Sequence, residues 1–291
     1  MIALTVGLAV LVGISLGLLG GGGSILTVPL LAYVAHMGAK QAIATSLLVV
    51  GTTSAVAAIS HARAGRVQWR TGLVFGVAGM AGAYAGGRVA KFIPGTVLLI
   101  GFALMMIATA VAMLRGRKNI EVKTGDHHLP VPKVVLEGLV VGLVTGLVGA
   151  GGGFLVVPAL ALLGGLPMPI AVGTSLVVIA MKSYAGFAGY LSTVSIDWKL
   201  AGMVTAAAVV GALIGARLTA LVNPDSLRQA FGWFVLLMSS IILAEEIHPA
   251  VGIGTAVLTV LAAFVFYGRK RREAAMDTPA GTIESAIEEV R

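Results

Sequence analysis

The chain has 291 residues, of which 58% are hydrophobic and only 11% are charged, and its mean hydropathy is +1.00. A soluble domain carries roughly twice that share of charged residues, so the composition excludes an ordinary soluble protein. The sequence contains no cysteine, which excludes disulfides, thiol chemistry and cysteine-bound zinc. The net charge of +8 does not indicate a nucleic-acid partner, because the basic residues gather in short loops and the tail, where they set membrane orientation.

Apolar stretches of about 18 residues or more recur along the chain, and each is long enough for a membrane helix. The sequence therefore predicts an all-α polytopic membrane protein. In the first half we expect two helical pieces at 2–19 and 24–36, followed by full spans at 42–60, 71–88 and 96–114. In the second half we expect pieces at 133–149 and 154–166, followed by spans at 171–192, 200–218, 228–243 and 249–267.

Charge, glycine and proline mark the boundaries between these parts. The predicted organisation is a first transmembrane repeat (1–114), a cytoplasmic linker (115–132), a second transmembrane repeat (133–243), an extra transmembrane helix (244–268) and a cytoplasmic polar tail (269–291).

Two glycine-rich stretches interrupt the apolar pattern: LGLLGGGGSILTVPLL at 16–31 and TGLVGAGGGFLVVPAL at 145–160. In a bilayer, unwound backbone survives only where it is packed in protein or lines a cavity. Paired interruptions in the two halves of a transporter indicate its binding site. The alternative is that these glycines only allow helices to approach closely.

A single shift aligns the two halves without a gap over about ninety residues. Gly13 meets Gly142 (142 − 13 = 129), Pro29 meets Pro158, and the motif Thr45-Ser46 meets the motif Thr174-Ser175 at the same offset. Such a repeat fixes the architecture before any single motif is read.

Loop charges suggest that the repeats are inverted. The basic loops 61–70 and 115–133 and the cluster Arg269–Arg272 belong inside, and Glu245–Glu246 belong outside. The span 171–192 then starts inside, whereas its counterpart 42–60 starts outside. This requires residues 133–166 to enter and leave the membrane on one face, as a re-entrant pair of half-helices. Arg88 and Lys91 fall outside, against the rule.

The paired motifs resemble the TauE/SafE family, also called the toluene sulfonate uptake permease family. The residues that carry the resemblance are the two glycine-rich stretches, AIATSL (42–47) with AVGTSL (171–176), and GAYAGGR (82–88) with GALIGAR (211–217). One departure is Ala150, where the first copy has Gly21. The resemblance implies a transporter, favouring export, of sulfite, sulfoacetate, other sulfonates or small organic acids in a bacterial inner membrane.

Backbone N–H groups at the start of a half-helix, together with its dipole, can bind an anion without a formal cation. The two glycine breaks predict such a site. Nearby Ser and Thr hydroxyls could donate to the anion or merely cap helices. The predicted substrate-binding residues are Gly21, Gly22, Gly23, Ser24, Thr45, Ser46, Gly151, Gly152, Gly153, Thr174, Ser175 and Lys182.

Lys182 lies about eleven residues into its span, where a lysine costs about 2.5–3.5 kcal/mol and should face the protein interior or a cavity. We expect it to balance the charge of the substrate; the alternative is a lysine that extends to the interface. Its counterpart in the first half is Thr53. Arg88 and Arg217 end matching spans, and they either recruit anions at the two entrances or anchor the helices in the interface.

No Asp or Glu lies at the centre of a predicted span, and no nucleotide-binding motif or nucleophile–base pair occurs at membrane depth. We therefore expect no enzyme activity, no metal and no cofactor. The expected partners are a small anionic substrate, the lipid bilayer and possible further copies of the chain. The predicted mechanism is alternating access around a midplane site, and the alternative is an anion channel with the same site and no alternating gate.

Overall fold

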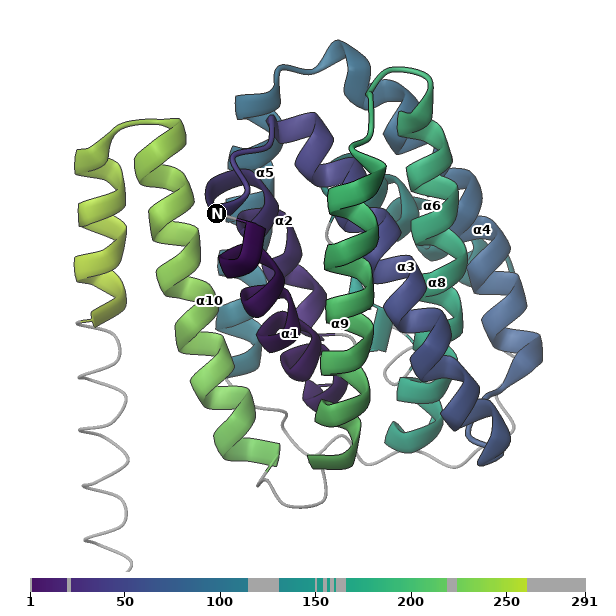
Figure 1. Cartoon of the computed structure of the whole chain (residues 1–291). Helices are drawn as coiled ribbons and strands as arrows, with labels where there is room; N and C mark the ends of the chain where they lie inside the picture. Colours follow the sequence, from purple (N-terminus) through teal and green to yellow (C-terminus); the bar gives the residue numbers. More distant parts are fainter. Residues whose placement is uncertain are drawn as a thin grey trace, which may run out of the picture.

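The structure is a computed structural model that describes residues 2–19, 22–114, 131–149, 151–153, 156–157, 160, 166–218 and 224–260. All regular structure in these residues is helical, and the helices stand side by side as a bundle (Figure 1). The expected all-helical membrane fold is therefore confirmed at this level. Gly21, most of the piece 154–166, nearly all of the linker and the whole tail 269–291 lie outside the described residues.

The first half begins with α1 and a short helical return that follows the first glycine cluster. The return starts as a tight 3₁₀ turn and passes Pro29 into a wider π turn, which ends when the N–H of Ala35 donates to the carbonyl of Leu30 (3.1 Å). The elements are α1 (Ile2–Leu19), η1 (Gly22–Leu26), α2 (Thr27–Pro29), η2 (Leu30–Val34), α3 (Ala39–Arg63), α4 (Trp69–Val89), η3 (Ala90–Phe92) and α5 (Gly95–Leu114).

The second half repeats the order of long helices. Its described elements are α6 (Val131–Val148), α8 (Met168–Leu191), α9 (Trp198–Leu218), α10 (Pro224–Glu246) and a last helix Pro249–Val260. Helix α6 begins two residues inside the expected linker, which is possible because Pro132 lies in the first turn, where no N–H is needed. Asp197 accepts a hydrogen bond from the N–H of Leu200 (3.0 Å) and so fixes the start of α9.

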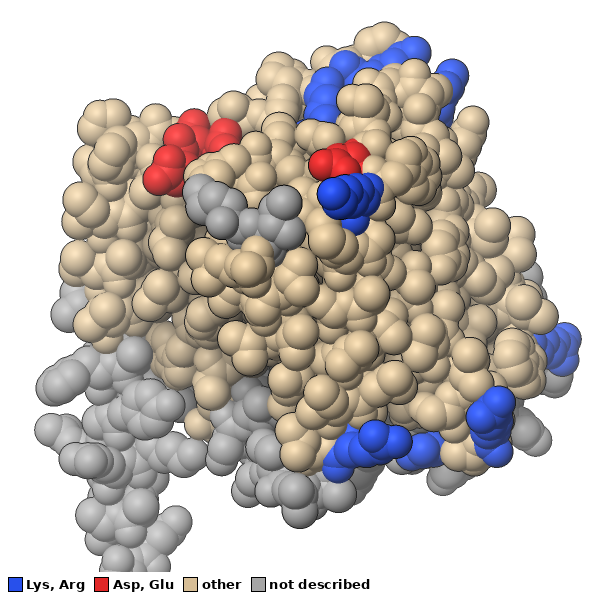
Figure 2. All heavy atoms as spheres, viewed as in Figure 1, with Lys and Arg blue, Asp and Glu red and all other residues tan. Residues whose placement is uncertain are grey.

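Five of the described helices are long and apolar enough to cross a membrane. They are Ala39–Arg63, Trp69–Phe92, Ile170–Leu191, Trp198–Leu218 and Gln229–Glu246. Shorter apolar helices accompany them at Ala3–Leu18, Ser24–Val34, Gly95–Val111, Val134–Val148 and Pro249–Val260. Figure 2 agrees with this reading, because Lys and Arg lie toward the two ends of the helices and the flank between them is uncharged.

Small residues bring helices of the two halves into backbone contact. A side chain at Gly13 on α1 would collide with the carbonyl of Ala208 on α9, and one at Gly142 on α6 would collide with the carbonyl of Gly79 on α4. These are one contact made twice, since 142 − 13 and 208 − 79 are both 129. Each half therefore packs its first helix against a helix of the other half: α1 against α9, and α6 against α4.

Helices α3 and α8, which correspond in the repeat, pack against each other at the centre of the bundle. A Cβ at Gly51 would lie 3.4 Å from the Cβ of Ser183, and one at Gly186 would lie 3.3 Å from Leu47. Residues later in α3 therefore contact residues earlier in α8, so the two helices run antiparallel. Between α4 and α8 the order is the same on both helices, because Gly72 meets Thr174 and Gly76 meets Met181.

Candidate functional site

The second glycine break ends α6 and turns the chain back. The N–H of Gly149 donates to the carbonyl of Thr145 (2.9 Å), and φ is +77° at Gly149, +60° at Gly151 and +66° at Gly152. These values lie in the left-handed region, which side chains disfavour, so glycine is required here. The N–H of Val156 then donates to the carbonyl of Gly152 (2.9 Å), so the backbone becomes helical again directly after the break.

The two glycine breaks meet, although 127 residues separate Ser24 from Gly151 in the sequence (151 − 24). A Cβ at Gly151 would lie 3.3 Å from the Cβ of Ser24, the residue that follows the first glycine cluster. Helix α3 packs over this junction, where Ser46 donates to the carbonyl of Gly149 (2.9 Å). Ser24 and Ser46 are both fully buried, so the junction lies inside the bundle.

Lys182 extends to the same junction from the middle of α8. Its side chain is only 1% exposed, and its Nζ donates to the hydroxyl of Thr145 on α6 (3.2 Å). A side chain at Gly152 would collide with the Nζ, so the ammonium lies directly against the backbone of the second break. Among the described residues no carboxylate lies within ion-pair distance of this amine, and its hydrogen bond is the one to Thr145.

Comparison with known proteins identifies the family. The model of the family described as sulfite exporter TauE/SafE matches residues 5–242. The chain belongs to the TauE/SafE family. It is therefore a multi-pass membrane transporter, as the paired glycine motifs predicted.

Curated relatives of this TauE/SafE chain carry the same general description. A probable membrane transporter protein of Xylella fastidiosa (strain Temecula1) is 34% identical over 245 residues, which cover 81% of this chain and 92% of the relative. The probable membrane transporter protein YdhB of Bacillus subtilis is 27% identical over 226 residues, covering 76% of this chain and 91% of the relative. The probable membrane transporter protein MJ0441 of Methanocaldococcus jannaschii is 31% identical over 195 residues, 64% and 72% of the two chains. No solved structure matches the chain.

The counterpart of Lys182 makes the glycine junction of this TauE/SafE transporter unequal in its two halves. Thr53 is fully buried on α3, and its hydroxyl donates back to the carbonyls of Val49 (2.8 Å) and Val50 (3.1 Å) of its own helix. A hydroxyl used in this way presents no positive charge. The cation therefore belongs to the second half alone.

Positions that are identical in the two halves do not share one role, as the paired Thr-Ser motifs demonstrate. Thr174 accepts a hydrogen bond from the N–H of Gln68 (2.9 Å) and so fastens the α3–α4 loop to α8. Ser175 donates to the carbonyl of Val172 in its own helix (2.8 Å). Thr45, by contrast, is fully buried and its hydroxyl has no hydrogen-bond partner. Of these four residues, Ser46 contacts the glycine junction, and Thr45 has a hydroxyl that could still donate a hydrogen bond.

The two arginines lie away from the junction. Arg88 is exposed at the end of α4, where its Nη1 donates to the hydroxyl of Ser192 (2.7 Å) just after α8. Arg217 is exposed in the last turn of α9. Because α9 begins six residues after Ser192 (198 − 192) and then runs 21 residues, Arg217 lies about 30 Å from that end of the bundle.

Sequence reasoning missed three buried hydroxyls, one at the junction and two on α3 and α8. Thr145, 2% exposed, is the partner of Lys182, and it lies at the first position of the second glycine-rich stretch. Ser54 and Ser183 correspond in the repeat (183 − 54 = 129), and both hydroxyls are buried without a hydrogen-bond partner. Ser183 follows Lys182 directly, and its match with Ser54 was the signal available in the sequence.

In the described part of the chain, no three His, Cys, Asp or Glu side chains come together. The junction instead collects an ammonium, hydroxyls and backbone amides. Such donors are suited to oxyanions, which accept hydrogen bonds at every oxygen.

Proposed function

We propose that this protein is a secondary transporter that exports small sulfur-containing or organic anions, such as sulfite, sulfoacetate and other sulfonates. The substrate binds where the two glycine breaks meet. One observation carries the proposal: the ammonium of Lys182 is buried against the second break with a single hydroxyl partner and no carboxylate among the described residues. An anion is the partner that this arrangement lacks.

The depth of Lys182 supports a midplane site. Helix α8 has 24 residues, and Lys182 lies 14 residues after Met168 and 9 before Leu191 (182 − 168 and 191 − 182). At 1.5 Å per residue, these intervals are about 21 Å and about 13 Å. An anion beside the Nζ would therefore lie well inside the hydrocarbon region, which is about 30 Å thick.

Charge and hydrogen bonding support a sulfonate or sulfite as the guest. These groups carry three oxygens on one sulfur, and an ammonium, a free hydroxyl and backbone N–H groups at a helix start can each satisfy one of them. Lys182 supplies the formal charge, Thr45 is a candidate hydroxyl donor, and the backbone turns helical again at the second break, where the N–H of Val156 bonds Gly152. The helix dipole adds partial positive charge there.

The pattern of helix contacts supports an inverted repeat. If the pseudo-twofold axis lies in the membrane plane, corresponding helices run in opposite directions, and the contacts between α3 and α8 follow that order. The contacts of α4 with α6 and with α8 run in the same order on each helix, so α6 and α8 point the same way. We infer that the chain between them returns across the second break as a re-entrant segment.

The burial of the junction supports alternating access over an open channel. Ser24, Thr45, Ser46 and Lys182 are at most 1% exposed, so the site is closed to both ends of the bundle. Transport then requires the two repeats to move and expose the junction to one side at a time. Arg88 and Arg217, at opposite ends, would attract anions to the two entrances. We place the basic tail in the cytoplasm of a bacterial inner-membrane protein.

Reconstitution tests the proposal directly. The purified protein is first screened for thermal stabilisation by sulfite, thiosulfate, sulfoacetate, taurine and simple carboxylates, since a ligand that binds only the folded state raises its melting temperature. The stabilising anion is then radiolabelled and its flux into proteoliposomes is measured. We expect counterflow: unlabelled anion inside the vesicles should accelerate entry of the labelled anion. Flux without such acceleration would indicate a channel, and absence of both binding and flux would overturn the proposal.

A further inference from the structure

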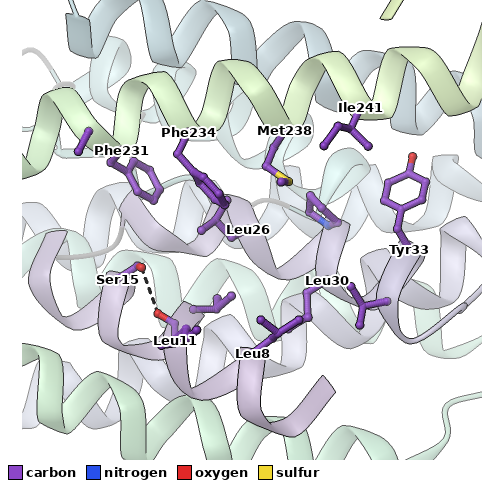
Figure 3. Close-up of a pocket in the computed structure, with 14 residues that line it drawn as sticks. Leu8, Leu11, Ser15, Leu26, Leu30, Tyr33, Phe231, Phe234, Met238 and Ile241 are labelled. Carbon is purple, nitrogen blue, oxygen red and sulfur yellow. Dashed lines mark hydrogen bonds between the residues drawn. The ribbon is translucent and has the colours of Figure 1, made fainter. Parts of the chain in front are cut away.

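A lipid-sized groove lies on the flank of the bundle, between α10 and the first repeat. It has a volume of about 680 Å³. Its walls come from α1 (Leu8, Leu11), from the return after the first glycine break (Leu26, Leu30) and from α10 (Phe234, Met238) (Figure 3). Helix α10 packs on α5 rather than on α1, which leaves this space between them.

The walls offer nothing to a polar ligand over most of their length. Ser15 is the one hydroxyl beside the deep end, and it donates to the carbonyl of Leu11 in its own helix (3.0 Å). The other polar group is Tyr33, whose hydroxyl donates to the carboxylate of Glu246 (3.3 Å). The groove is thus apolar along its length and has an acidic side chain near one end.

The length of the groove corresponds to one half of a bilayer. Along α10 its wall runs from Ala230 to Ile241, eleven residues or about 17 Å. The hydrocarbon core of a membrane is about 30 Å thick, so one leaflet contributes about 15 Å. The acidic end lies beyond Ile241, at the end of α10, and the deep end reaches Leu26, two residues after Ser24 at the glycine junction.

The charge at the open end selects the head group. Glu246 accepts the hydrogen bond from Tyr33, which lines this end of the groove, and Glu245 beside it is exposed. Figure 2 shows acidic atoms gathered near one end of the molecule. A carboxylate in the interface attracts an ammonium group and repels an anionic phosphate head. A head group that carries a primary ammonium can also donate hydrogen bonds to Glu246.

We propose that this groove binds one acyl chain of an ammonium-bearing phospholipid, of the phosphatidylethanolamine class, with its head group at Tyr33 and Glu246. The proposal needs only that the helices span a membrane and does not depend on the transported anion. A helix of a second copy is too wide, because a 15 Å length of helix about 10 Å in diameter fills about 1,200 Å³. The acyl chain would support the return segment from outside and so stiffen the first glycine break.

Photo-crosslinking with the full chain tests the proposal. A benzophenone amino acid is placed at Phe234, which lines the groove, and in a control at Leu237, which is exposed on α10 outside the groove. Each protein is reconstituted in vesicles of phosphatidylethanolamine and phosphatidylglycerol, mixed equally and with matched acyl chains. It is then extracted, washed in detergent and irradiated, and the adducts are identified by mass spectrometry.

We expect washed protein to retain lipid at Phe234 and to lose it at Leu237. The retained lipid should favour phosphatidylethanolamine by about threefold, the effect of one exposed ion pair. Equal loss at the two positions, or equal lipid ratios, would overturn the proposal. Adducts of Phe234 to a second copy of the chain, or to another part of the same chain, would overturn it as well.

Two variants separate the acyl-chain contact from the head-group contact. Leu30→Trp narrows the groove at its middle, so it should reduce the retained adduct at Phe234 while leaving the adducts at Leu237 before washing unchanged. Glu246→Gln keeps the groove, so lipid should be retained but without preference between the two head groups. Size-exclusion profiles establish that each variant is folded. Unchanged retention in Leu30→Trp, or an unchanged preference in Glu246→Gln, would contradict the respective half of the proposal.

Discussion

At the scale of single residues, the ammonium of Lys182 dominates the energetics of the junction. A lysine at the centre of a membrane helix costs about 2.5–3.5 kcal/mol on insertion scales, and one hydroxyl partner at 3.2 Å offsets only part of that cost. A bound anion would offset the remainder. The substrate and the lysine should therefore stabilise each other inside the bundle.

Lys182→Ala should reduce anion flux by at least about tenfold, because a hydrogen bond to a charged group contributes roughly 1.5–3 kcal/mol. The matched control is Thr53→Ala, its counterpart in the first half, whose hydroxyl bonds only its own helix. Flux in proteoliposomes is measured beside the size-exclusion profile. Unchanged flux in Lys182→Ala, with folded protein, would eliminate the countercharge role.

Ser46→Ala should lower the melting temperature by a few degrees. It removes the buried hydrogen bond to the carbonyl of Gly149, and such a bond contributes about 1 kcal/mol. Ser175→Ala is the matched control, since Ser175 bonds only Val172 in its own helix. Equal melting temperatures of the two variants in detergent would mean that the bond from α3 does not hold the break in place.

At the scale of elements, the sequence predicted that the two glycine breaks form one site, but it did not predict which residues touch there. The pattern of apolar runs and glycines depends on neighbours along the chain. The contact between Ser24 and Gly151 depends on how α1 and α6 cross α9 and α4, which no local pattern contains. For the same reason the repeat marked Thr174 and Ser175 as equivalents of Thr45 and Ser46, whereas the structure gives them other partners.

Helix ends also differ from the sequence prediction for a physical reason. Hydropathy predicted a span at 42–60, but α3 extends over Ala39–Arg63. Hydropathy measures only the apolar part of a helix, and its hydrogen-bonded turns continue through polar residues such as Lys40 and His61 into the interface. The spans were therefore predictable, and their ends were not.

Gly151→Leu should abolish transport, because φ is +60° at this position and a side chain would collide with Val50 on α3. Gly22→Leu should act in the same way at the first break. Gly202→Leu on α9 is the control, since nothing lies within 4 Å of a Cβ at that glycine. Flux per folded protein is the measurement. Full activity in Gly151→Leu would mean that the junction does not form the transport site.

At the scale of the whole molecule, the direction of the two repeats can be measured directly because the chain has no native cysteine. Ala64→Cys lies after α3, and Ser195→Cys lies after α8, the corresponding helix. If the repeats are inverted, a membrane-impermeant maleimide should label the two from opposite faces of oriented membrane vesicles. Labelling of both from one face would indicate repeats of the same orientation and would overturn the proposed topology.

The unequal pair Thr53 and Lys182 has a consequence for the conformation of the empty transporter between transport cycles. With two identical inverted halves, the inward-open and outward-open shapes would be related by the twofold axis and would have the same free energy. One lysine in one half removes that degeneracy, so the empty protein should wait with its opening toward a preferred side. A gene duplication followed by substitution in one copy would then give the carrier different apparent affinities on its two faces, while the gradient of the solute still sets the direction of net transport.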